Sequence, residues 1–398
     1  MSTLEIQTPD GPLVLDDDRF QELHNATDPA TPLPRVAYAA THVVMREAYG
    51  EIPHSPDAPG SSAEIAEYLD WDATMELRRR IGATGLGIAE AMDTAQRFSL
   101  GWDAAKELIR RTGELKLTAG FCAGAGSDQI PATKEPAELI AAVSEQIAFI
   151  RSHGGVPVIL PMPLLCELNL GPDDYVKIYQ EIIQEAPEDC PLIVHWLGEM
   201  FLPTLKGYFP GDSFQQVMRL DPTKVRGAKL SLLDHEIEIR LRRDLLERDQ
   251  LMFTGDDFHF AGLIAGDSSD QRTTTFDGRE VALGEFSHAL LGVLNAIATP
   301  AALALRRLGA GDRAGYDQIM RPCEVLGQTI FEAPTRYYKA GLAFLAWVNG
   351  LQPNTYLVNH EERCRDTTHL LNVVRNAVDA GAITNATASA QRLEEFLA

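Results

Sequence analysis

Short apolar runs alternate with longer amphipathic segments along most of the chain. The runs are rich in β-branched residues and lack the alternating polar positions of a strand with one wet face, so they predict parallel strands buried on both faces. The expected strands are residues 36–45, 85–93, 116–124, 157–163, 191–198, 225–231, 251–257 and 288–295. Intervening segments such as 135–152 repeat apolar residues every three to four positions, which predicts helices with one buried face.

Strand–helix units in unbroken succession predict an α/β fold, a (β/α)8 TIM barrel over residues 35–310. A doubly wound open sheet is the rival, but its first turn is commonly glycine-rich and the segment THVVMREAYG is not. Residues 1–34 are polar and proline-dotted, which indicates an N-terminal extension. Residues 311–398 carry helical patterns alone and predict a C-terminal helical cap, while residues 267–285 are expected to form a solvated loop able to cover the site.

Composition narrows the classes of function. The 398 residues include 57 acidic and 35 basic side chains, a formal charge of −22 that argues against nucleic-acid binding. No apolar run approaches the roughly 20 residues of a membrane span. The five cysteines are scattered, which indicates reduced thiols. With no secretory signal visible at the N-terminus, we expect a cytoplasmic protein with a small-molecule substrate.

Two strand ends carry candidate catalytic groups, because active sites of such barrels lie at the carboxyl ends of the strands. Lys229 ends the sixth expected strand. It either neutralises nearby acids or, if burial lowers its pKa, attacks a carbonyl group to form a Schiff base. His195 ends the fifth strand and is either a proton-transfer group or a packed histidine.

Further polar residues end the other strands and are candidates for binding substrate hydroxyl groups. They are His42 after the first strand, Glu90 and Asp93 after the second, and Asp256 and Asp257 after the seventh.

A divalent metal is an alternative use of the same rim. Glu90, His195, Asp256 and His259 together offer the mixed nitrogen and oxygen ligands that suit zinc, manganese or iron. No HxH or HExxH spacing supports this assignment. We therefore expect no cofactor, with a metal as the open alternative.

Several segments resemble one enzyme superfamily. GAKLSLLD, LMFTGDD, HALLGVLNAIATPAA and IFEAPTRYYKAGLAFLAWVNGL are similar to the sixth, seventh and eighth strands and first C-terminal helices of the dihydrodipicolinate synthase / N-acetylneuraminate lyase superfamily. KLTAGFCAGAGSDQ and PVILPMP fit its third and fourth strands, so the resemblance spans roughly residues 36–351. It implies a (β/α)8 barrel with C-terminal helices, a homo-oligomer, and Lys229 at the imine-forming position.

The same resemblance exposes departures. A GTTGE-type loop that holds a 2-keto acid is replaced by AEAMDT, residues 89–94, and the tyrosine expected on the fifth strand is replaced by His195. The tyrosine often found after the fourth strand is missing from PMPLLCE, and Tyr337 and Tyr338 are interpreted as packing or cap residues. We therefore expect a Schiff-base lyase or aldolase for a small carbohydrate-derived carbonyl compound. A metal-dependent sugar lyase or isomerase and a non-catalytic barrel are the alternatives.

Overall fold

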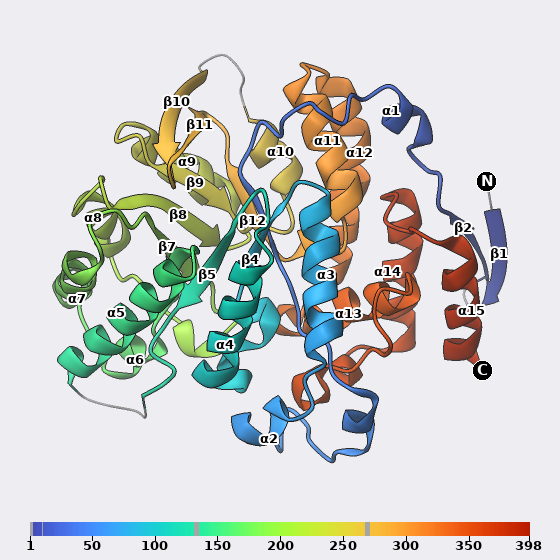
Figure 1. The fold of residues 1–398 in the computed structure, drawn as a ribbon, viewed down its shortest axis with the longest axis horizontal. Helices are drawn as coiled ribbons and strands as arrows, with labels where there is room; N and C mark the ends of the chain where they lie inside the picture. Colours follow the sequence, from blue (N-terminus) through green and yellow to red (C-terminus); the bar gives the residue numbers. More distant parts are fainter. Residues whose placement is uncertain (1–2, 10, 131–134, 267–270) are drawn as a thin grey trace.

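The computed structural model describes residues 3–9, 11–130, 135–266 and 271–398, and its centre is a closed parallel barrel (Figure 1). The strands follow one another around the barrel in the order β12-β3-β4-β5-β6-β7-β8-β9. Their bounds are β3 (Ala37–Ala40), β4 (Gly87–Glu90), β5 (Phe121–Ala125), β6 (Val156–Ile159), β7 (Leu192–Leu197), β8 (Val225–Ser231), β9 (Leu251–Thr254) and β12 (His288–Leu291). The prediction of a (β/α)8 barrel is confirmed.

Helices surround the barrel and continue beyond it. They are α1 (Gln21–Asn25), α2 (Ser62–Ala66), α3 (Trp71–Ala83), α4 (Arg97–Glu114), α5 (Pro136–Ser152), α6 (Pro163–Glu167), α7 (Pro172–Glu185), α8 (Ser213–Arg219), α9 (His235–Leu246), α10 (Phe260–Ala265), α11 (Ala298–Gly309), α12 (Arg313–Ile330), α13 (Lys339–Val348), α14 (Thr367–Asp379) and α15 (Ala386–Leu397). Local sequence sets their starts: Pro136 occupies the first turn of α5, and the Asp234 side chain accepts the first amides of α9. In the described ranges, no helix is long and apolar enough to cross a membrane.

Side-chain alternation along the barrel strands separates two cores. Ile193 on β7 and Cys122 on β5 belong to the cluster inside the barrel, whereas Val194 and Ala228 join the larger cluster shared with the helices. Successive side chains of a strand point to opposite faces. Lys229 lies one residue after Ala228, so it faces the barrel interior.

The N-terminal extension contains a hairpin that the sequence did not predict. Strands β1 (Thr3–Thr8) and β2 (Gly11–Asp16) pair antiparallel and pack against α15 and α14. The guanidinium of Arg375 on α14 donates to the Thr8 hydroxyl at 2.8 Å. The hairpin therefore joins the two ends of the chain, which lie together at one side of the molecule (Figure 1).

Residues 271–284 also form a hairpin, so the expectation of a solvated loop there is wrong for the described residues. Strands β10 (Gln271–Phe276) and β11 (Arg279–Gly284) meet at a tight turn in which Asp277 and Gly278 both have positive φ. An Asp-Gly pair favours this kind of hairpin turn.

This second hairpin closes the amino end of the barrel, opposite the expected site. Phe276 is buried against Phe253 inside the barrel, with ring centroids 5.6 Å apart. Arg226, near the start of β8, donates to the Thr274 hydroxyl at 2.8 Å. The hairpin is thus part of the barrel core and does not cover the carboxyl ends of the strands.

We expect Phe276→Ala to lower the free energy of unfolding by about 3 to 5 kcal/mol, because the substitution leaves a cavity beneath Phe253. Urea unfolding followed by fluorescence measures the change. Thr273→Ala on the exposed face of the same hairpin is the matched control and should stay within about 0.5 kcal/mol of the parent. Equal destabilisation by the two substitutions would show that the hairpin is not part of the core.

Candidate active site

Lys229 stands at the carboxyl end of β8 on the interior face of the barrel. The residue is 7% exposed, and its Cα is in register with His195 on β7. A Cβ at Gly255 would lie 2.9 Å from Lys229 Cε, so the glycine after β9 leaves room for the lysine stem. In the described part of the chain, Nζ of Lys229 forms no hydrogen bond or ion pair. The structure therefore holds a buried amine without a direct partner.

The surroundings of Lys229 favour its neutral form. Burial lowers its pKa to about 8, although the nearby carboxyl groups of Asp257 and Asp93 act in the opposite direction. An unshifted lysine titrates near 10.4. A larger fraction of the amine is therefore unprotonated, and so nucleophilic, at neutral pH.

The two aspartates after β9 have different surroundings. Asp257 is buried, accepts the Val293 amide at 2.8 Å, and has a pKa raised by burial despite the nearby Lys229 charge. Asp256 instead accepts the amides of Phe258 and His259 and pairs with His259 Nδ1 at 2.9 Å. Asp257 therefore belongs to the group around Lys229, whereas Asp256 shapes the turn that follows.

His195 is a buried, neutral imidazole beside the lysine. Burial and the charge of Lys229 lower its pKa well below the usual value. Its Nε2 lies 3.1 Å from the Ser231 hydroxyl, and its Nδ1 has no hydrogen-bond partner in the described ranges. A buried ring nitrogen without a partner is uncommon and marks a position where a ligand atom would be stabilised.

A third group joins the barrel to the C-terminal helices. Asp93, in the short helix η2 (Asp93–Ala95), accepts hydrogen bonds from the hydroxyl of Tyr338 at 3.0 Å and from Nζ of Lys339 at 3.2 Å. The Tyr338 hydroxyl also lies 2.8 Å from the hydroxyl of Thr94. Lys339 is further paired with Glu361 at 3.8 Å. Asp93 follows the carboxyl end of β4 and Lys229 lies near the carboxyl end of β8, which places this group at the same end of the parallel barrel as the lysine.

Glu90 is not brought to the group around Lys229. It follows the inward-facing Ala89 and therefore points outward, where it forms a fully buried ion pair with Arg78 of α3 at 2.5 and 2.8 Å. The Thr112 hydroxyl and the Ala91 amide also donate to it. Burial acts to raise the pKa of Glu90, but these partners outweigh it and lower the pKa.

His42 is likewise held by protein groups. Its Nε2 lies 2.6 Å from the Gln352 side-chain oxygen and its Nδ1 lies 2.6 Å from the Asn295 amide nitrogen. Burial lowers its pKa to about 4. Both ring nitrogens are therefore engaged, and His42 links the barrel to the segment after α13.

The candidate metal ligands do not converge. The described residues include no group of three or more histidine, cysteine, aspartate or glutamate side chains placed to hold a metal ion. Glu90 pairs with Arg78, and Asp256 pairs with His259. Within the described ranges, His195 bonds to neither pair and instead lies beside Ser231. The four residues do not fit a metal centre.

Several members of the site were not predicted from the sequence. Ser231 and Cys122 share the inward direction of Lys229, and strand alternation is the signal that would have found them. Tyr338 and Lys339 come from the C-terminal region, where the sequence suggested packing or cap residues.

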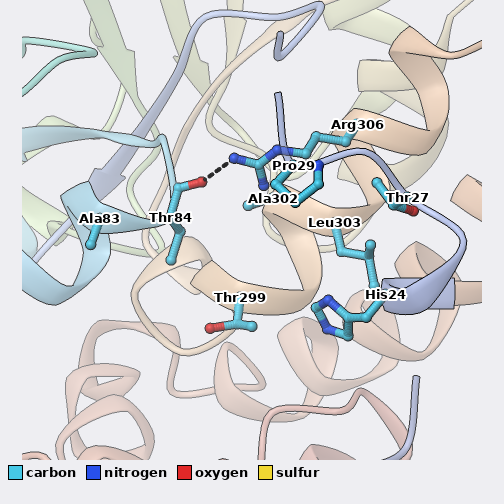
Figure 2. A pocket seen from close by; sticks show the side chains of 9 residues that line it. All are labelled: His24, Thr27, Pro29, Ala83, Thr84, Thr299, Ala302, Leu303 and Arg306. Carbon is cyan, nitrogen blue, oxygen red and sulfur yellow. Dashed lines mark hydrogen bonds between the residues drawn. The ribbon is translucent and has the colours of Figure 1, made fainter. Parts of the chain in front are cut away.

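A surface pocket elsewhere on the molecule is distinct from this site. Figure 2 shows the pocket, of about 200 Å³, between the segment after α1, the end of α3 and helix α11, where Arg306 donates to the Thr84 carbonyl at 2.9 Å. Since α3 leads into the start of β4, the pocket lies towards the amino ends of the strands. None of the predicted site residues lines it.

The closed barrel and its C-terminal helices define the class: the chain has the fold of dihydrodipicolinate synthases and N-acetylneuraminate lyases, as the resemblance predicted. Similar structures include dihydrodipicolinate synthase from Oceanobacillus iheyensis (TM-score 0.58, 12% identity, 91% of this chain and 98% of that chain covered). Another is dihydrodipicolinate synthase from Aquifex aeolicus (TM-score 0.60, 11% identity, 87% of this chain and 99% of that chain covered). A third is N-acetylneuraminate lyase from Mycoplasma synoviae (TM-score 0.54, 14% identity, 87% of this chain and 98% of that chain covered).

In sequence, the chain belongs to the family described as "Protein of unknown function (DUF993)", whose profile matches residues 7–398. No curated protein matches the sequence. The chain therefore has a fold shared with many solved structures, but its sequence belongs to a divergent branch.

We expect Glu90→Gln to reduce stability by about 3 to 5 kcal/mol, because it leaves the buried Arg78 guanidinium without its counter-ion. Glu76→Gln is the matched control: it removes exposed ion pairs on the same helix and should cost less than about 1 kcal/mol.

The loss of stability in Glu90→Gln should depend on pH in a definite direction. A carboxyl group whose pKa is lowered by folding stabilises the protein above its unfolded pKa and loses that contribution as pH falls. The difference between parent and Glu90→Gln, measured by urea unfolding, should therefore shrink below about pH 4. A difference that grows on acidification would contradict the structural role of Glu90.

Proposed function

We propose that the protein is a class I, Schiff-base lyase or aldolase that acts on a small carbohydrate-derived carbonyl compound through Lys229. The observation that carries the proposal is the buried, unpartnered amine with a lowered pKa, at the strand ends where barrel enzymes hold their active sites. The neighbouring acids and the neutral imidazole add the proton-transfer groups that such chemistry needs.

Each neighbour of Lys229 has a role in this proposal. The neutral amine attacks the substrate carbonyl carbon to give a carbinolamine, and water leaves to give the iminium ion. Asp257, raised in pKa by burial, carries the proton that the departing hydroxyl group needs. His195 binds a substrate hydroxyl through the ring nitrogen that has no protein partner.

The charges around the site favour a neutral substrate over a 2-keto acid. Asp93 acts on Lys229, and Lys339, the cation next to Asp93, is already shared between Asp93 and Glu361. In the loop after β4, the Ala91 amide donates to Glu90 at 2.8 Å and is not free for a carboxylate. A polyhydroxylated aldehyde or ketone supplies hydroxyl groups that these acids can bind without repulsion.

No specific observation favours the metal-dependent or non-catalytic alternatives. The expectations of a homo-oligomer, a cytoplasmic location and no cofactor stay predictions.

Borohydride trapping tests the proposal directly. Incubation with dihydroxyacetone or glyceraldehyde and then sodium borohydride should add the reduced carbonyl compound to Lys229, because borohydride fixes an iminium as a stable secondary amine. Peptide mass mapping locates the adduct, and the Lys229→Ala protein should gain none there.

Lys224 is an internal control in the same map. It is equally buried, at 7% exposed, but its Nζ donates to the Ala186 carbonyl at 2.9 Å. Lys224 should stay unmodified. A panel of small aldehydes, ketones and 2-keto acids that leaves Lys229 unmodified would overturn the proposed mechanism.

The titration of Lys229 is a separate prediction. In protein labelled with ¹³C-lysine, the Cε resonance that is lost in Lys229→Met should titrate near pH 8, well below the pKa of an ordinary lysine. Asp257→Asn should move the midpoint lower still, because it removes a charge that raises the Lys229 pKa.

Asp256→Asn is the matched control, because Asp256 is held by its own turn and by His259. Its effect on the Lys229 titration should be clearly smaller. A midpoint near 10 in the parent protein would show that burial does not activate the amine.

A further inference from the structure

The ring of Tyr338 covers the carboxyl end of β12. It stacks on Phe331 with centroids 4.3 Å apart and an interplanar angle of 17°, and the edge of Phe201, from the segment after β7, meets it at 6.0 Å. A Cβ at Gly292, directly after β12, would lie 2.7 Å from the Phe331 ring and 3.3 Å from the Tyr338 ring. The tyrosine is therefore held in one orientation above the barrel mouth.

The hydroxyl group of Tyr338 is part of a short hydrogen-bonded chain. It donates its proton to Asp93 Oδ2 at 3.0 Å, so the Thr94 hydroxyl at 2.8 Å must be the donor to the tyrosine oxygen. A hydroxyl oxygen has one donor position and two acceptor positions. One acceptor position of the Tyr338 oxygen therefore has no partner among the described residues.

The carboxylate at the end of this chain is fixed by a cation. Nζ of Lys339 donates to Asp93 Oδ2 at 3.2 Å and to the Arg336 carbonyl at 3.0 Å. Burial alone would lower the pKa of Lys339, but Asp93 and Glu361 outweigh it and raise the pKa. Asp93 therefore lies beside a permanent positive charge.

The hydroxyl chain shares its electrostatic surroundings with the lysine. Asp93 and Asp257 act on Lys229, and the same two carboxyl groups act on Tyr338. Burial, reinforced by Asp93, raises the Tyr338 pKa well above 10, so the group stays a phenol and does not ionise by itself. Such a phenol can give its proton to Asp93 only if its oxygen receives another proton at the same time.

Resting on the proposed imine at Lys229, we propose that Tyr338 is a further catalytic residue, which carries a proton from the carbon next to the imine to Asp93. In this step the substrate Cα–H bond breaks and a new bond forms between that proton and the Tyr338 oxygen. The tyrosine gives its own proton to Asp93 Oδ2. The electron pair of the Cα–H bond forms the carbon–carbon double bond of an enamine, and the iminium π pair moves to the Lys229 nitrogen.

The consequence is that the C-terminal helical region completes the active site. The reactive amine comes from the barrel, whereas the phenol that moves the proton and the cation that fixes its acceptor are Tyr338 and Lys339 at the start of α13. Reversal of the same step protonates an enamine at Cα, so one residue serves both directions of the reaction.

Hydrogen exchange into dihydroxyacetone tests this role. In D₂O, the parent protein should catalyse deuterium incorporation at Cα, which ¹H NMR follows. Tyr338→Phe keeps the ring stacked on Phe331 but removes the hydroxyl, so exchange should slow by about 100-fold or more. Borohydride trapping of dihydroxyacetone on Lys229 should stay within about twofold, because the amine is untouched.

Tyr337→Phe is the matched control, a neighbouring tyrosine outside the hydroxyl chain, and it should exchange at the parent rate with an unchanged melting temperature. Asp93→Asn should slow exchange as much as Tyr338→Phe, and the double variant should be no slower than either, because both residues serve one proton transfer.

The outcomes separate the two proposals. Parent protein that is trapped by dihydroxyacetone but exchanges no deuterium, or Tyr338→Phe that exchanges within threefold of the parent, would overturn the role of Tyr338 and leave the lysine mechanism standing. Parent protein that is never trapped would remove the lysine mechanism and the role of Tyr338 with it.

Discussion

The alternation of side chains across a closed barrel is the constraint on which the site depends. Lys229 and His195 lie near the carboxyl ends of neighbouring strands, and both point inward because Ala228 and Val194, the residues before them, face the helices. Inside the barrel the lysine loses hydration, and in the described ranges no group bonds to its amine. The buried amine without a direct partner is therefore a consequence of strand direction and burial, because the same side chain shifted by one residue would lie in the helix layer.

The barrel wall also separates two sets of charges that are close in sequence. Glu90 ends β4 facing outward and forms a bidentate ion pair with Arg78, which joins α3 to the wall. Asp93, three residues later in η2, bonds to Tyr338 and Lys339 instead. A buried ion pair gives little net stability but is costly to break, so its effect is to fix one arrangement of the wall. Under the proposed function, the Glu90–Arg78 ion pair fixes the end of β4 and so holds the following loop, which carries Asp93, at the mouth of the barrel.

Much of the fold follows from local sequence, and less of the site does. Apolar strands separated by amphipathic helices predict a barrel because each unit is local and repeated. The hairpin over 271–284 was missed because its strands are mostly polar, and only the Asp277–Gly278 turn and the buried Phe276 distinguish it from a loop. Lys229 and His195 follow from a rule about strand ends, whereas the outward direction of Glu90 needs the register of β4 as well.

Tyr338 lies beyond such rules, since its hydroxyl meets an aspartate 245 residues earlier in the chain. That hydrogen bond joins the C-terminal region to the carboxyl end of the barrel, a contact that the helical pattern of the sequence does not predict. Asp93 follows β4 of the barrel, whereas the phenol and the ammonium that bond to it come from the start of α13. The carboxylate from one part of the chain is therefore bonded to two groups from the other. If the reaction proceeds as proposed, the barrel alone would form an imine but would lack the phenol that moves the next proton, so the two parts of the chain divide the chemistry between them.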